Sequence, residues 1–195
     1  MARTQAADYD AKREAITGAA AKLFAEKGFA GASVSDLADR CAVSKSLIYH
    51  YYASKEAILF DVMNEHIDDL LSVVEARPNG SGEPAREIHN LTKDLLQHYV
   101  GAAERQKVLL YELASLPAEH QAEIKTKQRR IIAHVERLIG DAIPELARDK
   151  TRLSAKTMLF FGMLNWTHTW FKSKGGLSRD ELAGMAAETI LGDGD

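Results

Sequence analysis

Apolar residues recur along most of the chain at intervals of three and four positions, which is the spacing of residues on one face of an α-helix. The 195 residues include only four prolines and few runs of β-branched residues, so little interrupts this pattern. The pattern predicts an all-α fold of about nine helices. They are expected at roughly 8–27, 55–75, 85–102, 105–115, 119–142, 150–173 and 179–191, with two short helices within 33–52.

Capping residues mark several of these expected helix ends. Gly28 can adopt the left-handed conformation that ends the first helix. Ser33, followed three residues later by Asp36, has the arrangement of a capping box. Ser44 or Lys45 is expected to open the next short helix. The boundaries of the two short helices are therefore specified by local side chains.

Two breaks divide the second half of the chain. The segment 77–84, with the sequence RPNGSGEP, combines proline, glycine, asparagine and serine and is the clearest loop. Ser178 and Glu181 form a second capping box directly after Gly175 and Gly176. We therefore expect the last helix to begin next to Ser178.

Residues 33–52 have the pattern of a tri-helical helix-turn-helix unit, in which one helix supports a second helix that lies in the major groove of DNA. Spacing by one helical turn indicates which helical side chains face the core, and Val43 is expected to pack against the core at the turn between the two helices. The positions expected to pack inward are Leu37, Ala38, Cys41, Val43, Ile48 and Tyr52. The positions left to the exterior are Lys45, Ser46, Leu47, Tyr49 and His50. Lysine, hydroxyl and imidazole groups can donate to phosphates and base edges.

The distribution of charged residues along the chain supports this interpretation, whereas the net charge of the chain does not. The formal net charge is −3, which gives no general argument for nucleic acid. Residues 1–60, however, have eight Lys and Arg against seven Asp and Glu, and the segment 40–55 contains three basic residues and three tyrosines but no acidic residue. If any surface of this chain faces phosphate, we expect it to be this one.

Composition excludes several classes of protein. Hydrophobic residues make up 46% and charged residues 27%, as in ordinary globular domains, which excludes wholesale disorder. The single cysteine, Cys41, excludes an intramolecular disulfide, and we expect it to be a small buried residue rather than a redox sensor. No metal site and no cofactor are expected. Without a long apolar run or a signal-peptide pattern, the chain is expected to be soluble and cytoplasmic, with no membrane partner.

The segment 33–59, with the sequence SVSDLADRCAVSKSLIYHYYASKEAIL, resembles the DNA-binding signature of the tetracycline-repressor (TetR) family of bacterial regulators. The resemblance extends upstream through AAKLFAEKGF at 20–29 and covers roughly residues 10–60. Ala42 and Ser46 stand where the family often has glycine. The resemblance implies a DNA-binding domain over residues 1–54 and an effector-binding and dimerisation domain over residues 55–195.

By this resemblance, Lys45, Ser46 and Leu47 occupy base-reading positions, and Tyr49, Tyr51 and Lys55 occupy phosphate-binding positions. The full expected DNA-binding set is Ser33, Ser35, Ser44, Lys45, Ser46, Leu47, Tyr49, His50, Tyr51 and Lys55. The N-terminus of the helix that begins near Lys55 can also attract a phosphate through its free N–H groups. The alternative, that the tyrosines only pack and the lysines are only solvated, stays open.

The expected helix 150–173 has two apolar stripes, so both of its sides must be covered. One cover can be its own domain, and the other is expected to be a second copy of the chain. This expectation is similar to the arrangement in TetR-like proteins, which dimerise through their last two helices. The expected interface residues are Met158, Trp170, Leu182 and Met185. A homodimer would read a palindromic operator in double-stranded DNA, and a small molecule would release it by moving the helix 55–75.

The segment 162–182 resembles the C-terminal pattern of TetR regulators that sense acyl-CoA thioesters, although Lys174 replaces a proline that is frequent there. This resemblance implies a CoA thioester, such as phenylacetyl-CoA or a fatty acyl-CoA, as the effector. The expected ligand-binding residues are Tyr99, Tyr111, Arg130, Phe161, Asn165 and Trp166. An aromatic stripe of this kind can instead be core or dimer interface. A free aromatic or multidrug-type effector, acting on an efflux or catabolic operon, is the other alternative.

Two other classes of protein, an enzyme and a helical adaptor, fit the sequence less well. The chain has no His-Glu-x-x-His pair, no glycine-rich phosphate loop and no nucleophile elbow, so we do not expect an enzyme. A helical adaptor that retains a vestigial helix-turn-helix would not need Lys45, Tyr49, Tyr51 and Lys55 to be intact. Retardation of DNA distinguishes these classes, because neither an enzyme nor an adaptor should prefer a palindrome.

Overall fold

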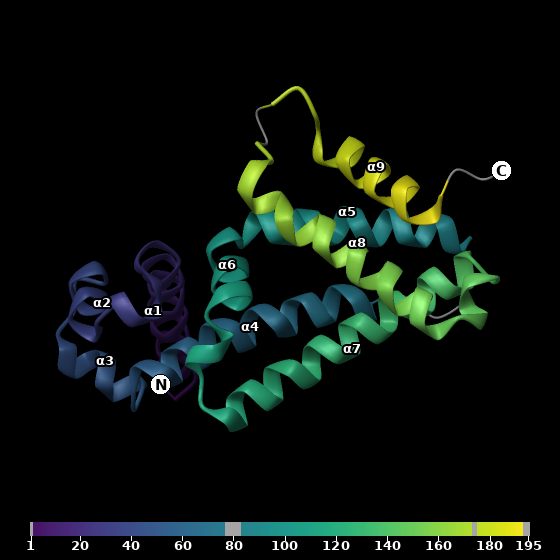
Figure 1. Cartoon of the computed structure of the whole chain (residues 1–195). Coiled ribbons are helices and arrows are strands. Elements are labelled where there is room, and N and C mark those ends of the chain that lie inside the picture. The colour runs from purple at the N-terminus through teal and green to yellow at the C-terminus, as the bar shows by residue number, and fades with distance from the viewer. Residues whose placement is uncertain (1, 77–82, 173–174, 193–195) are drawn as a thin grey trace. The chain divides into compact units, whose positions relative to one another are not determined.

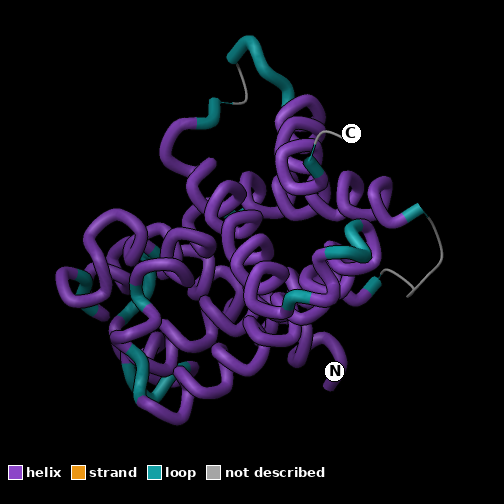
Figure 2. Tube along the Cα trace, turned by 45° about the vertical axis from the view of Figure 1, so that its right-hand side comes forward, coloured by secondary structure: helices purple, strands orange, loops and turns teal. Residues whose placement is uncertain are grey.

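The structure, a computed structural model, describes residues 2–76, 83–172 and 175–192, with side chains from residue 8 onward. Figure 1 shows the helices in chain order, and the described trace contains only helices and loops (Figure 2), which confirms the predicted all-α fold. The helices are α1 (Ala2–Gly31), α2 (Val34–Arg40), α3 (Lys45–Tyr51), α4 (Lys55–Glu75), α5 (Pro84–Gly101), α6 (Ala103–Tyr111), α7 (Ala118–Ala142), α8 (Lys150–Trp170) and α9 (Arg179–Leu191), with short 3-10 turns η1 (Leu113–Ser115) and η2 (Leu146–Arg148).

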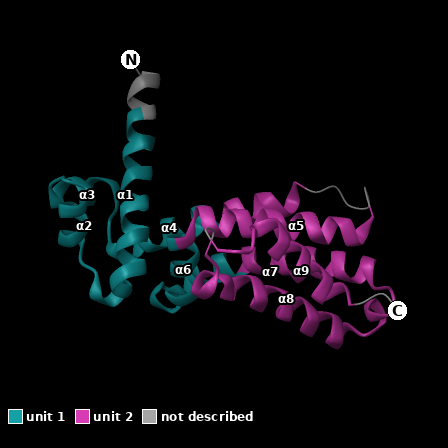
Figure 3. Ribbon diagram, turned by 90° about the horizontal axis from the view of Figure 1, so that it is seen from above, with its two compact units in different colours: residues 1–67, 104–125 teal, residues 68–103, 126–195 magenta. Residues whose placement is uncertain are grey.

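The chain divides into two compact units, shown in different colours in Figure 3. The first comprises residues 1–67 and 104–125, and the second comprises residues 68–103 and 126–195. This partition follows contacts and not function, so the functional division between residues 54 and 55 stays a prediction. Residues 77–82 of the expected loop lie outside the described residues. Within the described part of the chain, no helix is both long and apolar enough to cross a membrane.

The regular part of the first helix ends where it was predicted to end. Gly28 has φ 72° and ψ 159°, which are not helical angles, so α1 consists of two helical segments separated by a kink at this residue, the second reaching Gly31. Glycine suits this position because it has no Cβ to oppose a positive φ. The positive φ at Gly28 confirms the prediction that the first helix is interrupted there.

Local caps define the two short helices as predicted. The Ser33 hydroxyl accepts a hydrogen bond from the Asp36 amide at 3.0 Å, and the Asp36 carboxylate accepts one from the Ser33 amide at 2.9 Å. Ser44 caps α3 by accepting from the amide of Leu47 at 3.2 Å. Ser54 accepts from the amide of Ala57 at 3.1 Å and begins α4. These bonds satisfy amide groups that lack partners within the first turn of a helix.

The Asp36 carboxylate also receives a 2.7 Å hydrogen bond from Lys27, and this bond and those from Ser33 lower the pKa of Asp36. A lowered pKa in the folded state stabilises the fold in full above the unfolded-state pKa of about 4, and the stabilisation is lost progressively as the pH falls from there through the lower folded-state pKa. We expect the urea midpoint of Asp36→Asn to lie below that of the wild type at pH 7, and we expect this gap to be smaller at pH 3. Asp39→Asn, on the same helix but outside the box, is the control. A gap that is the same at both pH values would contradict the prediction.

The first unit has a core formed mainly by α1, α2, α3 and α4. Its most deeply buried side chains are Leu23, Phe24, Leu37, Ile48, Ile58, Leu59 and Val62. The inward positions predicted for the helix-turn-helix are confirmed for Leu37, Ala38, Ile48 and Tyr52.

Cys41 and Val43 are only half-buried, which corrects the expectation that both pack fully inward. Cys41 is the C-terminal cap residue of α2, and Ala42 then turns the chain with φ 52°. The turn therefore carries both side chains toward the edge of the core. Partial burial raises the pKa of the Cys41 thiol, which disfavours the reactive thiolate.

The second unit packs α5, α8 and α9 against one another (Figure 1). Its buried side chains include Leu91, Leu95, Leu96, Phe160, Leu164, Ala183 and Ile190. The capping box of Ser178 and Glu181 is present at the start of α9, as predicted. One side of α8 is therefore covered by its own unit, which confirms half of the two-sided prediction for this helix.

Candidate functional sites

Helix α3 is anchored on one face and presents polar side chains on the other. Ile48 is fully buried and Tyr52, at the C-terminal cap, is 5% exposed. The exposed side chains of α3 are Lys45, Ser46, Tyr49 and His50, and Leu47 is half-buried. Every exterior position predicted for this helix thus has some access to solvent. A short, rigidly seated helix with lysine, hydroxyl and imidazole groups outward can enter a DNA groove.

Aromatic contacts organise this exterior face. The ring of Tyr51 lies 4.7 Å from the ring of Tyr9 on α1 and 5.4 Å from the ring of His50. The ammonium group of Lys45 lies 5.9 Å from the centre of the Tyr49 ring. The hydrophobic pattern does not single out Tyr9, because nothing in the local sequence links it to α3. The expected phosphate-binding phenol of Tyr51 is therefore supported by a residue of another helix.

Lys55 has protein partners in addition to its expected role at phosphate. Its ammonium group donates hydrogen bonds of 2.8 Å to the carbonyl oxygens of Phe29 and Ala32, and it lies 4.1 Å from the centre of the Phe29 ring. These contacts stabilise the carbonyl groups that follow the last turn of α1. An ammonium group has three N–H donors, so two such bonds leave one donor for a phosphate. The phosphate-binding role of Lys55 stays a prediction.

The two serines expected near the DNA backbone are both exposed on the supporting helix. Ser33 is engaged in the capping box described above, whereas Ser35 lies in the first turn of α2. Their backbone amides are at a helix N-terminus, where an anion is favoured. Contact of either residue with DNA stays a prediction.

A polar cluster around the buried carboxylate of Asp61 joins three helices of the first unit. Arg13 on α1 donates two hydrogen bonds to Asp61 on α4, at 2.6 and 2.9 Å. The Tyr52 hydroxyl donates to the same carboxylate. Asp61 is 6% exposed, so its charge depends on these partners. The bonds to Tyr52 and Asp61 raise the pKa of Arg13, and burial together with Asp61 raises the pKa of Tyr52.

One turn further along α4, a second set of polar contacts reaches α6. Glu65 accepts from Thr17 at 3.2 Å and forms an ion pair with Arg105 at 3.1 Å. The next residues in each helix, His66 and Gln106, form a buried 2.6 Å hydrogen bond. Burial raises the pKa of Glu65. The hydrophobic pattern does not predict these contacts, since their members are far apart in sequence.

The residues expected to bind the effector are distributed over both units. Tyr111 belongs to the first unit and is exposed. The others belong to the second unit, where Tyr99 and Phe161 are buried and Arg130 forms a 2.6 Å ion pair with Glu75. The structure of neither unit by itself brings all six together. Their role in binding a ligand stays a prediction.

Asn165, which is expected to bind the effector, and His168 are both half-buried. A ring nitrogen of His168 lies 2.6 Å from the carbonyl oxygen of Asn165, one turn earlier in α8. Trp166, expected to bind ligand, is 61% exposed. It faces outward together with the residues expected in the dimer interface, because it shares their stripe of α8.

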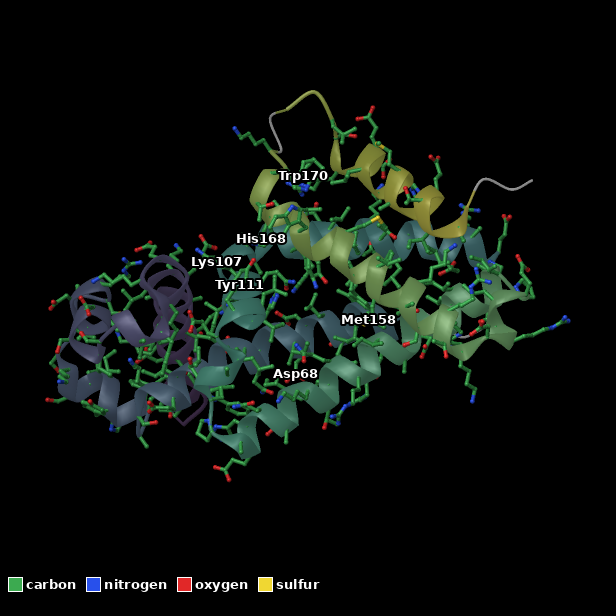
Figure 4. The ribbon with its side chains drawn as sticks, viewed as in Figure 1. Asp68, Lys107, Tyr111, Met158, His168 and Trp170 are labelled. Atoms are coloured by element: carbon green, nitrogen blue, oxygen red, sulfur yellow. The ribbon has the colours of Figure 1, made fainter. Side chains whose placement is uncertain are left out.

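An apolar groove of about 540 Å³ lies between α8 and α9. Its lining includes Leu159, Trp166, Trp170, Leu182 and Met185. Figure 4 shows Trp170 and Met158 along α8. The exposed fractions are 52% for Met158, 49% for Trp170 and 55% for Met185, whereas Leu182 is nearly buried. Exposed apolar side chains concentrated on one surface are typical of a protein interface.

The family models match both parts of the chain. Residues 16–62 match the model for bacterial regulatory proteins of the tetR family. Residues 81–193 match the model for the tetracyclin repressor-like C-terminal domain. The chain belongs to the TetR family of transcriptional regulators. This assignment indicates a regulator rather than an enzyme, and it agrees with the helix-turn-helix found in the first unit.

Individual relatives extend the comparison. A TetR-family transcriptional regulator from Bordetella parapertussis is 38% identical, with a TM-score of 0.87 over 92% of this chain and 93% of that one. The structure of AibR with isovaleryl coenzyme A and operator DNA is 24% identical, with a TM-score of 0.80 over 92% and 98% of the two chains, and is similar in fold. The regulator YuxN of Bacillus subtilis is 29% identical over 134 residues, 66% of this chain but only 45% of YuxN.

Proposed function

We propose that this chain is a DNA-binding transcriptional repressor that acts as a homodimer and is released from a palindromic operator by a small molecule. The observation that carries the proposal is the seating of α3. Ile48 and Tyr52 are buried while Lys45, Tyr49 and His50 are exposed, within a segment that matches the family's DNA-binding model. Repression is proposed because the second model is that of repressor-like domains.

The homodimer is proposed from the apolar groove between α8 and α9. One short recognition helix makes few contacts with DNA, and two such helices related by a twofold axis read a palindrome with higher affinity. Trp170 and Met185 provide the kind of large, partly exposed side chains that form the centre of interfaces. A second copy of the chain would cover these side chains.

For the effector we propose a CoA thioester. The aromatic segment at the end of α8 resembles acyl-CoA-responsive regulators, and AibR, which has the same fold, was solved with isovaleryl coenzyme A. The buried apolar side chains of the second unit can offer an acyl chain an apolar environment. Lys127 and Arg130 would exchange their acidic partners for the phosphates of CoA. A free aromatic compound or a multidrug-type ligand is the second candidate.

A mobility-shift titration against the DNA that flanks the gene tests both levels of this proposal. The titration is run alone and with a panel of acyl-CoAs and their free acids. Retardation that one thioester abolishes and its free acid does not would support a CoA-sensing repressor. Retardation relieved by an aromatic acid or a drug would favour the second candidate. Absence of sequence-specific retardation would reject the DNA-binding function and favour a helical adaptor.

Replacement of Lys45 tests the base-reading role of α3. We expect Lys45→Ala to lose about tenfold of its discrimination at particular base pairs of the operator, because good contacts to a base edge contribute roughly 1 to 3 kcal/mol. The measurement is binding to a library of operators with each position randomised. Lys22→Ala, an exposed lysine of α1, is the control for loss of one charge. An unchanged preference in Lys45→Ala at every position would contradict the role.

A further inference from the structure

We propose that Asp61 is a positioning residue that holds the recognition helix α3 in the orientation needed to read DNA. This inference rests on the proposed DNA-binding function. It assigns a task to a buried carboxylate on α4 that is not among the residues expected to contact DNA. All of the residues involved belong to the first unit.

Tyr52 links the end of α3 to α4. Tyr52 is the C-terminal cap of α3, and its amide donates to the carbonyl of Ile48 at 3.0 Å. Its ring is buried, and its hydroxyl donates to the Asp61 carboxylate on the second turn of α4. Only two residues separate Tyr52 from the start of α4. The hydroxyl bond therefore restricts rotation at a short connection that would otherwise allow α3 to tilt.

The carboxylate of Asp61 is itself held in place by an arginine. Arg13 of α1 binds both oxygens of Asp61, at 2.6 and 2.9 Å, and its guanidinium carbon lies 5.9 Å from the centre of the Tyr52 ring. A bidentate arginine fixes both the position and the plane of a carboxylate. The oxygen that accepts from Tyr52 is therefore held by two helices, and α3 takes its orientation from both α1 and α4.

Polar contacts to neighbouring helices continue along the same face of α4. Glu65, one turn after Asp61, accepts from Thr17 of α1 and pairs with Arg105 of α6. Like charges one turn apart on a helix repel each other unless each has its own partner. Arg13 and Arg105 supply those partners, one for each carboxylate on this face of α4. Asp61 is the member of this pair that contacts the recognition helix.

The test compares three variants on an operator selected from a randomised DNA pool by the wild-type protein. Tyr52→Phe removes one hydroxyl and keeps the buried ring, and Asp61→Asn removes the charge that holds it. Glu26→Gln is the matched control, because Glu26 also pairs with an arginine, Arg40, at 2.6 Å, but on the exposed side of α2 and away from α4. Far-UV circular dichroism establishes the temperature at which every variant is folded.

We expect Tyr52→Phe and Asp61→Asn each to bind the operator about tenfold more weakly, the factor that loss of a charge-assisted hydrogen bond predicts. Affinity for random-sequence DNA and the salt dependence of binding should stay at wild-type values, because no phosphate contact is lost. The double variant should lose less than the product of the two single losses, since both changes weaken the same group of hydrogen bonds among Arg13, Tyr52 and Asp61. Glu26→Gln should bind as the wild type does.

A purely structural role would lower the melting temperature but leave the operator affinity of the folded variants unchanged, and that result would overturn the inference. Equal losses on operator and random DNA would overturn it as well. Should Asp61→Asn not fold, Tyr52→Phe decides the question by itself. A wild-type protein that selects no sequence from the pool would reject the proposed function, and this inference with it.

Discussion

Replacement of Met185 by glutamate is expected to convert the proposed homodimer into monomers. Met185 is 55% exposed and lines the apolar groove between α8 and α9. A carboxylate placed at the centre of an apolar interface would lose its water without gaining a partner. We expect the dissociation constant of the dimer to rise at least about 30-fold, since central interface residues contribute roughly 2 kcal/mol or more. Light scattering measures the mass directly.

The fold of the monomer should survive this change. Glutamate is a good helix former, and an exposed position of α9 accepts it without burial. Affinity for a palindromic operator should fall with the dimer, because the two recognition helices would then bind independently. Val100→Glu is the control, because Val100 is an exposed apolar residue of α5 that does not line the groove. Trp170→Ala should act in the same direction as Met185→Glu. A dimeric mass for Met185→Glu would refute the proposed interface.

The second large effect is expected from truncation in the core of the first unit. Phe24 is 2% exposed and lies edge-on to Phe29, with 5.5 Å between ring centres. Phe24→Ala should lower the free energy of unfolding by about 3 to 5 kcal/mol, because it removes buried contacts and leaves a cavity. The ring of Phe29 also supports the ammonium group of Lys55, so the loss should spread to the start of α4.

Urea denaturation at one fixed protein concentration measures this loss, because the stability of a dimer depends on concentration. Phe24→Leu is the graded control and should cost much less, since it refills most of the volume. Tyr9→Ala provides a surface comparison on the same helix, at a side chain that is 42% exposed. Similar losses for Phe24→Ala and Tyr9→Ala would show that Phe24 is not part of a tightly packed core.

The prediction of secondary structure succeeded where neighbouring residues decide the outcome. The caps at Ser33, Ser44 and Ser178 form hydrogen bonds within three residues, so their sequence spacing is sufficient to place them. The expected start of α9 and the expected limits of α4 agree with the structure for the same reason. Gly28 is a further example, because the positive φ that interrupts α1 there follows from the absence of a Cβ.

The sequence predicted the exposed face of α3 better than it predicted the roles of the apolar stripes of α8. The exposed face of α3 follows from helical periodicity, which places Ile48 and Tyr52 on one side and Lys45 and Tyr49 on the other. Periodicity also predicted two apolar stripes on α8, but it could not tell a stripe that lines a pocket from one that faces outward. Trp166, which is expected to bind the effector, is 61% exposed beside the groove, and its role in binding stays a prediction.

The order of nearby residues was enough to predict the all-α fold, the ends of its short helices, the family and the polar face of α3. Which distant groups meet depends on how the helices pack. Arg13 and Asp61 lie 48 positions apart, and Lys55 binds carbonyl groups 23 and 26 positions upstream. No periodic pattern records such pairs, since a buried charge takes its partner from whichever helix the fold brings within hydrogen-bond distance.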